Sequence, residues 1–128
     1  MLPQFLLPEK IARENGVGGE VQCDDRILNL TLGITRVVAE EMLEVSVWGS
    51  ADCKHWRHLV SFPQKFYCGV YLLVLDLTSQ VDVRYLRAQW RMERWAKEER
   101  WAKEERVPIF GFYLRAEAGR LRRKAGAA

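Results

Sequence analysis

Alternation of apolar and polar residues over Leu43–Trp48 is the clearest pattern in this chain. Aliphatic side chains at the odd positions are separated by Glu44 and Ser46, which is the period of a strand with one buried face. Small and polar turn residues follow at 49–52, and Trp56 stands where the chain would return. The segment predicts a β-hairpin, and this hairpin indicates the fold class.

Further strand-like segments follow one another along the chain, separated by turn residues. Val70–Leu77 is almost wholly apolar, which is typical of a strand covered on both faces. The pattern favours an all-β fold, a single antiparallel β-sandwich of jelly-roll-like form over residues 27–116. Trp90, Phe110 and Phe112 are predicted to lie in its core. The other predicted strands are Leu28–Leu32, Ile34–Ala39, His55–Phe62, Val83–Met92 and Ile109–Leu114.

Both ends of the chain are predicted to lie outside the sandwich. Two prolines and three glycines interrupt residues 1–26, so we expect an N-terminal arm with at most a short helix over Pro8–Glu14. Residues 117–128 are rich in arginine and predict a basic, flexible tail. No Sec signal peptide and no apolar run of about eighteen residues is present. We therefore expect a soluble chain, cytoplasmic or exported by another route.

A six-residue segment is repeated without change at 95–100 and 101–106. Such a copy is most simply an insertion tolerated in a surface loop, and a short salt-bridged helix near 93–106 would suit its composition. On a helix, six residues give a net rotation of about 240°, so the two tryptophans would not share a face. On an extended ribbon they would share one, because six is an even number. In either case we expect at least one tryptophan to protrude. The predicted contact surface joins this segment to the arm and comprises Trp95, Trp101, Arg94, Arg100, Leu6 and Leu7.

Composition and charge narrow the range of partners. The 128 residues carry 20 basic and 17 acidic side chains, a formal charge of +3, which does not favour nucleic acid as a partner. Cys23, Cys53 and Cys68 are widely spaced and contain no C-x-x-C pair, so the spacing predicts no zinc ribbon or thioredoxin-type site. Three reduced thiols is the simpler interpretation, and one disulfide with a free thiol remains open.

The densest group of reactive residue types is Asp52, Cys53, His55 and His58. On a strand, the period of two would place Cys53 and His55 on one side and His58 on the other, which disfavours a metal site. Ser50 lacks the surroundings of a nucleophile elbow. Cys53 could pair with His55 or His58, but nothing in the sequence orients either histidine as a base. We predict no catalytic residues, no cofactor and no metal.

Two fragments, residues 48–56 and 82–87, resemble the discoidin-type, galactose-binding-like β-sandwich domains. Those domains carry a strand ending in S-x-D-G-x-x-W and a later R-Y-(V/I/L)-R strand, and Cys53 stands where they usually have glycine. The resemblance implies a jelly-roll sandwich in which Arg84, Tyr85 and Arg87 brace their strand. It carries no binding residue over to this chain.

Two functions from different classes remain open at this point. The first is a non-enzymatic structural or assembly subunit, which forms a homo-oligomer or filament through its N-terminal arm, edge strands and tryptophan-rich loop. The second is a carbohydrate-binding module of galactose-binding-like type, in which exposed aromatic rings stack on sugars.

Overall fold

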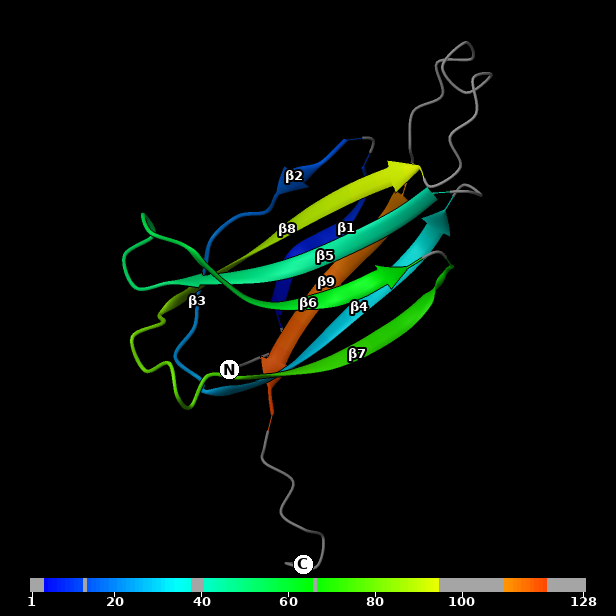
Figure 1. Ribbon diagram of the computed structural model, residues 1–128. Coiled ribbons are helices and arrows are strands. Elements are labelled where there is room, and N and C mark those ends of the chain that lie inside the picture. Colours follow the sequence, from blue (N-terminus) through cyan, green and yellow to red (C-terminus); the bar gives the residue numbers. More distant parts are fainter. Residues whose placement is uncertain (1–3, 13, 38–40, 66, 95–109, 120–128) are drawn as a thin grey trace, which may run out of the picture.

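Two antiparallel sheets packed face to face make up the part of the chain that the structure describes (Figure 1). The computed structural model describes residues 4–12, 14–37, 41–65, 67–94 and 110–119. The fold is therefore all-β, as predicted. Its strands are β1 (Gln4–Ala12), β2 (Gly16–Val17), β3 (Val21–Gln22), β4 (Ile27–Val37), β5 (Glu41–Ser50), β6 (Arg57–Lys65), β7 (Gly69–Asp76), β8 (Tyr85–Arg94) and β9 (Phe110–Ala118).

The strand order is that of a jelly roll. One sheet has the order β1-β9-β4-β7, and the other has the order β2-β8-β5-β6, with β3 also pairing with β8. If β2 and β3 are taken as one interrupted strand, each sheet alternates early and late strands, as two interleaved Greek keys require. Strands distant in sequence therefore pair with each other, as β1 does with β9.

Alternating apolar residues from both sheets form the core. Leu28, Leu30 and Leu32 of β4 are fully buried and face the equally buried set that begins with Leu43 on β5. Trp90 of β8 and Phe112 of β9 bridge the two sheets, with ring centroids 5.7 Å apart in an edge-on arrangement. Trp90, Phe112 and Phe110 are all buried, which confirms the three predicted core aromatics.

The predicted N-terminal arm is wrong for the described part of residues 1–26. Residues 4–12 form a strand, not a helix, and β1 pairs with β9 at one edge of its sheet. Leu6 and Leu7 are each 2% exposed, so they belong to the core and not to a contact surface. The register shifts on both sides of Leu7, and these irregularities let two neighbouring residues point inward. They also erase the period of two that would have revealed the strand.

The second correction concerns β7, which is an edge strand with one face open to solvent. Val70, Leu72 and Val74 are 64%, 74% and 61% exposed, whereas Leu75 is buried. Its apolar composition had predicted cover on both faces. Composition cannot separate these cases, because a strand apolar at every position looks the same whether or not a layer covers its second face.

Several predicted boundaries also change. Leu28–Leu32 and Ile34–Ala39 belong to one strand, β4, which runs through Gly33 as far as Val37. The C-terminal strand continues to Ala118, two residues into the predicted tail. The duplicated hexapeptide and residues 120–128 lie outside the described residues, whereas 93–94 end β8 as strand. Within the described ranges, no helix has the length and apolarity to cross a membrane.

Adjacent positions on β4 should differ sharply in their effect on stability. Leu30→Ala removes a fully buried side chain and is expected to lower the free energy of unfolding by about 2–5 kcal/mol. The matched control, Thr31→Ala on the outer face of the same strand, should lower it by less than about 1 kcal/mol. Urea denaturation measures both, and equal losses at the two positions would contradict the inward orientation of Leu30.

Candidate functional site

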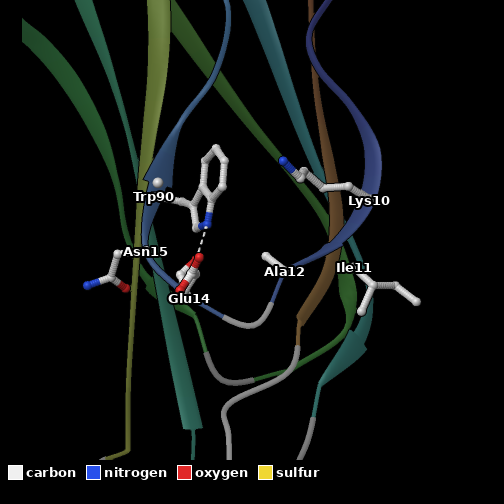
Figure 2. Close-up of a pocket in the computed structure, with 7 residues that line it drawn as sticks. Lys10, Ile11, Ala12, Glu14, Asn15 and Trp90 are labelled. Atoms are coloured by element: carbon white, nitrogen blue, oxygen red, sulfur yellow. Dashed lines mark hydrogen bonds between the residues drawn. The ribbon is translucent and has the colours of Figure 1, made fainter.

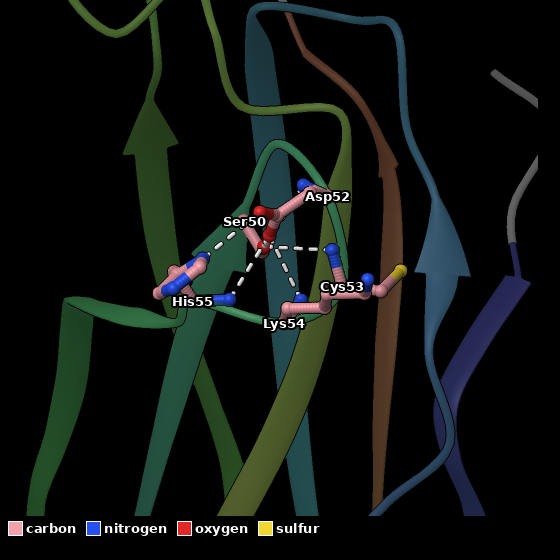
Figure 3. A network of polar contacts seen from close by, with 5 residues as sticks. All are labelled: Ser50, Asp52, Cys53, Lys54 and His55. Carbon is pink, nitrogen blue, oxygen red and sulfur yellow. Dashed lines mark hydrogen bonds and ion pairs between the residues drawn. The ribbon is translucent and has the colours of Figure 1, made fainter.

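The turn between β5 and β6 brings together part of the predicted reactive cluster, but it does so for structural reasons. Ser50 Oγ accepts hydrogen bonds from the backbone N–H groups of Asp52 and Cys53, at 3.1 and 2.9 Å. Asp52 Oδ1 accepts from the N–H groups of Lys54 and His55, at 2.8 and 2.9 Å. Figure 3 shows these bonds converging on two side chains. The pair caps a tight turn in which Cys53 has a φ of 64°.

The order of contacts in this turn differs from that of a catalytic triad. Asp52 lies between the other two groups: it accepts a hydrogen bond from Ser50 Oγ at 3.0 Å, and its Oδ2 lies 2.9 Å from His55 Nδ1. In a serine hydrolase the histidine occupies the middle position and takes the proton of the serine. Here Ser50 is buried and its oxygen is occupied by backbone donors. The hydrogen bonds from His55 and Lys54 hold the pKa of Asp52 well below its usual range.

The remaining members of the predicted cluster point elsewhere. His58 lies on β6, 2.6 Å from Ser61 Oγ and edge-on to the Trp48 ring. His58 and His55 have different partners, in agreement with the prediction that they lie apart. The reason is not the alternation of a strand, because residues 51–55 form a turn. No group of three potential metal ligands occurs in the part of the chain that the structure describes.

Two of the thiols, Cys23 and Cys53, lie in surroundings that disfavour a nucleophile. None of the three cysteines forms a disulfide. Burial raises the pKa of the Cys23 thiol, and desolvation together with the nearby carboxylate of Glu20 raises the pKa of Cys53. A raised pKa lowers the thiolate fraction at neutral pH, and the thiolate is the reactive form.

A hollow of about 560 Å³ lies beside Trp90 at the β1–β2 connection (Figure 2). Its polar groups hold the fold together. Trp90 Nε1 donates to the Glu14 carbonyl at 2.8 Å, and Asn15 Oδ1 accepts from the backbone N–H of Met92 at 2.7 Å. The Lys10 ammonium lies 4.4 Å from the centre of the Trp90 ring. The residues that line the hollow therefore attach the β1–β2 connection to β8 at the margin of the sandwich.

The outer face of the β2-β8-β5-β6 sheet has a different character, polar with one partly buried indole, that of Trp48. A groove of about 280 Å³ crosses β6, β5 and β8. Trp48 Nε1 donates to Ser46 Oγ at 2.9 Å, and Arg91 pairs with Glu44 at 2.8 Å. Hydroxyl, amide and charged groups beside an aromatic ring are the groups that bind a polar ligand. The groove is lined by Glu44, Ser46, Trp48, His58, Ser61, Gln89, Trp90 and Arg91.

The outer face of the opposite sheet is apolar along β7 and again at Tyr113 and Phe5, whereas between them Asn29 and Thr31 of β4 stand opposite Glu117 and Arg115 of β9. It starts at β7 with Val70, Leu72 and Val74, which stand opposite Gly33, Thr31 and Asn29 of β4. Gly33 has no side chain, and the Tyr113 ring of β9 occupies the space where a Cβ would lie. The Phe5 ring of β1 then meets Tyr113 edge-on, with centroids 5.9 Å apart. We call this set the apolar face: Val70, Leu72, Val74, Tyr113 and Phe5.

The long described edge strands differ in how they are protected from pairing with another chain. β1 contains Pro8, two charged residues and two register shifts, and β6 contains Pro63 with further register shifts. Prolines, charges and bulges are the usual devices that prevent edge-to-edge association. β7 has none of them before Asp76 and pairs with β4 over eight residues without a shift. Lys65 reaches this strand from β6, but its ammonium lies over the ring of Tyr71 on the core-facing side.

The structure contradicts the predicted contact surface at two of its six residues. Leu6 and Leu7 are buried, and Trp95, Arg100 and Trp101 lie outside the described residues. Arg94 is the last residue of β8. The prediction missed β7, although β4 offered a signal: its alternation of leucines with Asn29 and Thr31 indicates that this sheet has one uncovered face.

The two fragments of the discoidin-like resemblance are neighbours in space. Trp48 on β5 stands opposite Arg87 on β8, and the Arg87 guanidinium lies 4.3 Å from the centre of the Trp56 ring. Comparison of the chain with protein-family models, with curated proteins and with solved structures finds no match. The resemblance therefore stays a prediction.

The Asp52 turn should contribute to stability in a pH-dependent manner. Because the pKa of Asp52 is lowered in the folded state, its contribution is complete above the unfolded value near 3.9 and is lost as the pH falls below it. Asp52→Asn should therefore be less stable than the wild type at pH 5, and the difference should shrink towards pH 2. Urea midpoints at several pH values measure this. A difference that does not change with pH would show that the charge of Asp52 has no role.

Proposed function

We propose that this protein is a non-enzymatic assembly subunit that self-associates through the apolar face and the open edge of β7. One observation carries the proposal: an edge strand of regular geometry exposes Val70, Leu72 and Val74 to solvent. An exposed edge offers unpaired backbone groups, and contiguous apolar surface on a soluble domain marks an interaction site. Both features coincide on β7.

The energetic case depends on apolar area. Burying an aliphatic side chain such as valine or leucine contributes roughly 1.5–3 kcal/mol when it passes from full exposure to full burial. In an edge-to-edge contact the three exposed side chains on β7 gain cross-strand neighbours in both copies, so each contributes only a part of this value. Backbone hydrogen bonds between the two edges add to it, and together they must offset the loss of translational and rotational freedom on association, roughly 4–15 kcal/mol.

The absence of enzymatic activity belongs to the same proposal. Its support is that the described clusters of polar groups serve the fold: Ser50 and Asp52 cap a turn, and Glu14 and Asn15 close the sandwich. The jelly-roll fold itself is used by capsid, lectin and enzyme domains, so it does not select among these functions. The duplicated tryptophan segment remains a predicted further contact.

Self-association predicts that a charge on β7 will produce monomers. The wild-type chain should elute in size-exclusion chromatography with a light-scattering mass at least twice the 14.9 kDa of one chain, and Leu72→Lys should return it to about one chain. An ammonium at this 74%-exposed position is solvated in the monomer, whereas two such groups brought together on the same face of paired β7 strands would repel each other. Val81→Lys is the matched control, because Val81 is 69% exposed and lies off the strand. A monomeric wild type would rule out the proposal.

A second candidate function, saccharide binding, is favoured by the polar groove on the other sheet. Carbohydrates present hydroxyl groups and apolar ring faces, and this groove combines an indole with hydroxyl and amide groups. Its polar groups already bond to each other, as in the Trp48–Ser46 and His58–Ser61 contacts. They are therefore ordered before a ligand arrives, which reduces the entropic cost of binding.

Saccharide binding is tested on a glycan array with the wild type, Trp48→Ala and Gln89→Ala. If the groove binds a sugar, the loss of the indole should reduce affinity by at least tenfold, because it removes most of the apolar contact with the ring. Leu72→Lys is the control, since it lies on the opposite sheet and should bind normally. An array without hits for the wild type would exclude this function.

A further inference from the structure

The outward-facing residues of β7 read the same in both chain directions. Reading from Val70 to Val74, the outward residues are Val, Leu and Val, so an antiparallel copy presents the same series. In a two-fold symmetric contact each patch must be complementary to itself, and the outward series of β7 meets this condition. The strand carries no charge before Asp76, so two copies would meet without repulsion between like charges.

The pleat and the length of the strand limit the register. Directly opposed residues of an antiparallel pair point to the same face, so an outward residue must stand opposite an outward residue. With Leu72 opposite itself, Val70 stands opposite Val74 of the second copy, and the overlap runs from Gly69 to Leu75. A shift of one step towards Asp76 would place its carboxylate opposite Val70. The register centred on Leu72 leaves Asp76 outside, where Thr78 satisfies it with two hydrogen bonds.

The same register also matches the inward side of the strand. Tyr71 and Leu73 are partly buried and pack against the core cluster. Centred on Leu72, the pairing sets Tyr71 opposite Leu73 of the second copy, so the two partly covered core margins meet each other. Apolar contacts would then continue on the outer side of the joined sheet, and on the inner side Tyr71 would meet Leu73 next to the Lys65 ammonium that lies over the Tyr71 ring.

We propose that two copies of this chain pair β7 to β7 in antiparallel orientation, with Leu72 on the two-fold axis, which joins the two four-stranded sheets into one continuous sheet. This inference rests on the proposed self-association and specifies its partner and geometry. The partner is a second copy because the pattern is self-complementary and because β1 and β6, the other long described edges, are interrupted by proline and register shifts. A contact of this type closes on itself and forms a dimer, not a filament.

Disulfide trapping in the full chain tests the register. The background carries Cys53→Ser and Cys68→Ser, which remove the two thiols that are not buried. Leu72→Cys places the two new thiols opposite each other, with Cα atoms about 4.5–5.5 Å apart, within reach of a disulfide. Mild oxidation should convert most of this variant to a covalent dimer on a non-reducing gel.

The flanking positions supply matched controls. Val70→Cys alone, or Val74→Cys alone, places the paired thiols about 13 Å apart along the strand, so neither should cross-link with itself. An equimolar mixture of the two variants should form the mixed disulfide, because these positions stand opposite each other. Dimers of Val70→Cys alone, or none from Leu72→Cys while light scattering still shows dimers, would overturn the register and leave the proposed self-association standing.

Hydrogen–deuterium exchange of the unmodified protein gives a readout that no substitution can disturb. Backbone amides of β7 should exchange more slowly in concentrated than in dilute protein, by up to about 15-fold at a total concentration of 100 times Kd for a monomer–dimer equilibrium. Protection that depends on concentration in β1 or β6 instead would overturn the inference while self-association holds. No dependence on concentration anywhere, with a monomer in light scattering, would overturn both.

Discussion

Packing of the two alternating inner faces is the constraint on which this structure depends. Each strand of the sandwich can bury one side chain in two, so the fold exists only if both sheets offer large apolar residues at matching positions. Leucines on β4 meet the inward residues of β5 and β8, and Trp90 reaches across to Phe112. The position of Trp90 then determines its surroundings. A side chain at Gly16 would overlap its ring, and its N–H needs the Glu14 carbonyl because a buried donor without a partner is costly.

The two outer faces of the sandwich, which the core does not use, differ in polarity. The outer face of the β2-β8-β5-β6 sheet is polar and linked by its own hydrogen bonds, whereas that of the β1-β9-β4-β7 sheet is apolar at β7 and covered by Tyr113 over Gly33. Packing inside the domain requires none of Val70, Leu72 or Val74, since their side chains point away from it. Polar side chains at these positions would favour the isolated domain. This is why the outer surface of β7, and not a pocket, is the basis of the proposed function.

The reactive residue types of the β5–β6 turn have a structural role that their spacing conceals. Ser50 and Asp52 satisfy backbone N–H groups in a turn with a left-handed residue at Cys53. His55 pairs with Asp52 but reaches no nucleophile. Clusters of serine, aspartate and histidine thus need their order of contacts before they can be interpreted as catalytic.

The sequence by itself determined the all-β class, most strands and the core aromatics, because alternation over Leu43–Trp48 and the leucines of β4 follows from the period of a strand. It did not determine β1, where irregular pairing places Leu6 and Leu7 side by side in the core. Nor did it determine which apolar strand lies at an edge. Only tertiary structure decided that β7 has no outer neighbour among the described strands and that Gly33 lets Tyr113 lie beside it. The physical reason is that alternation reports which residues share a face, whereas cover on that face depends on strands distant in sequence.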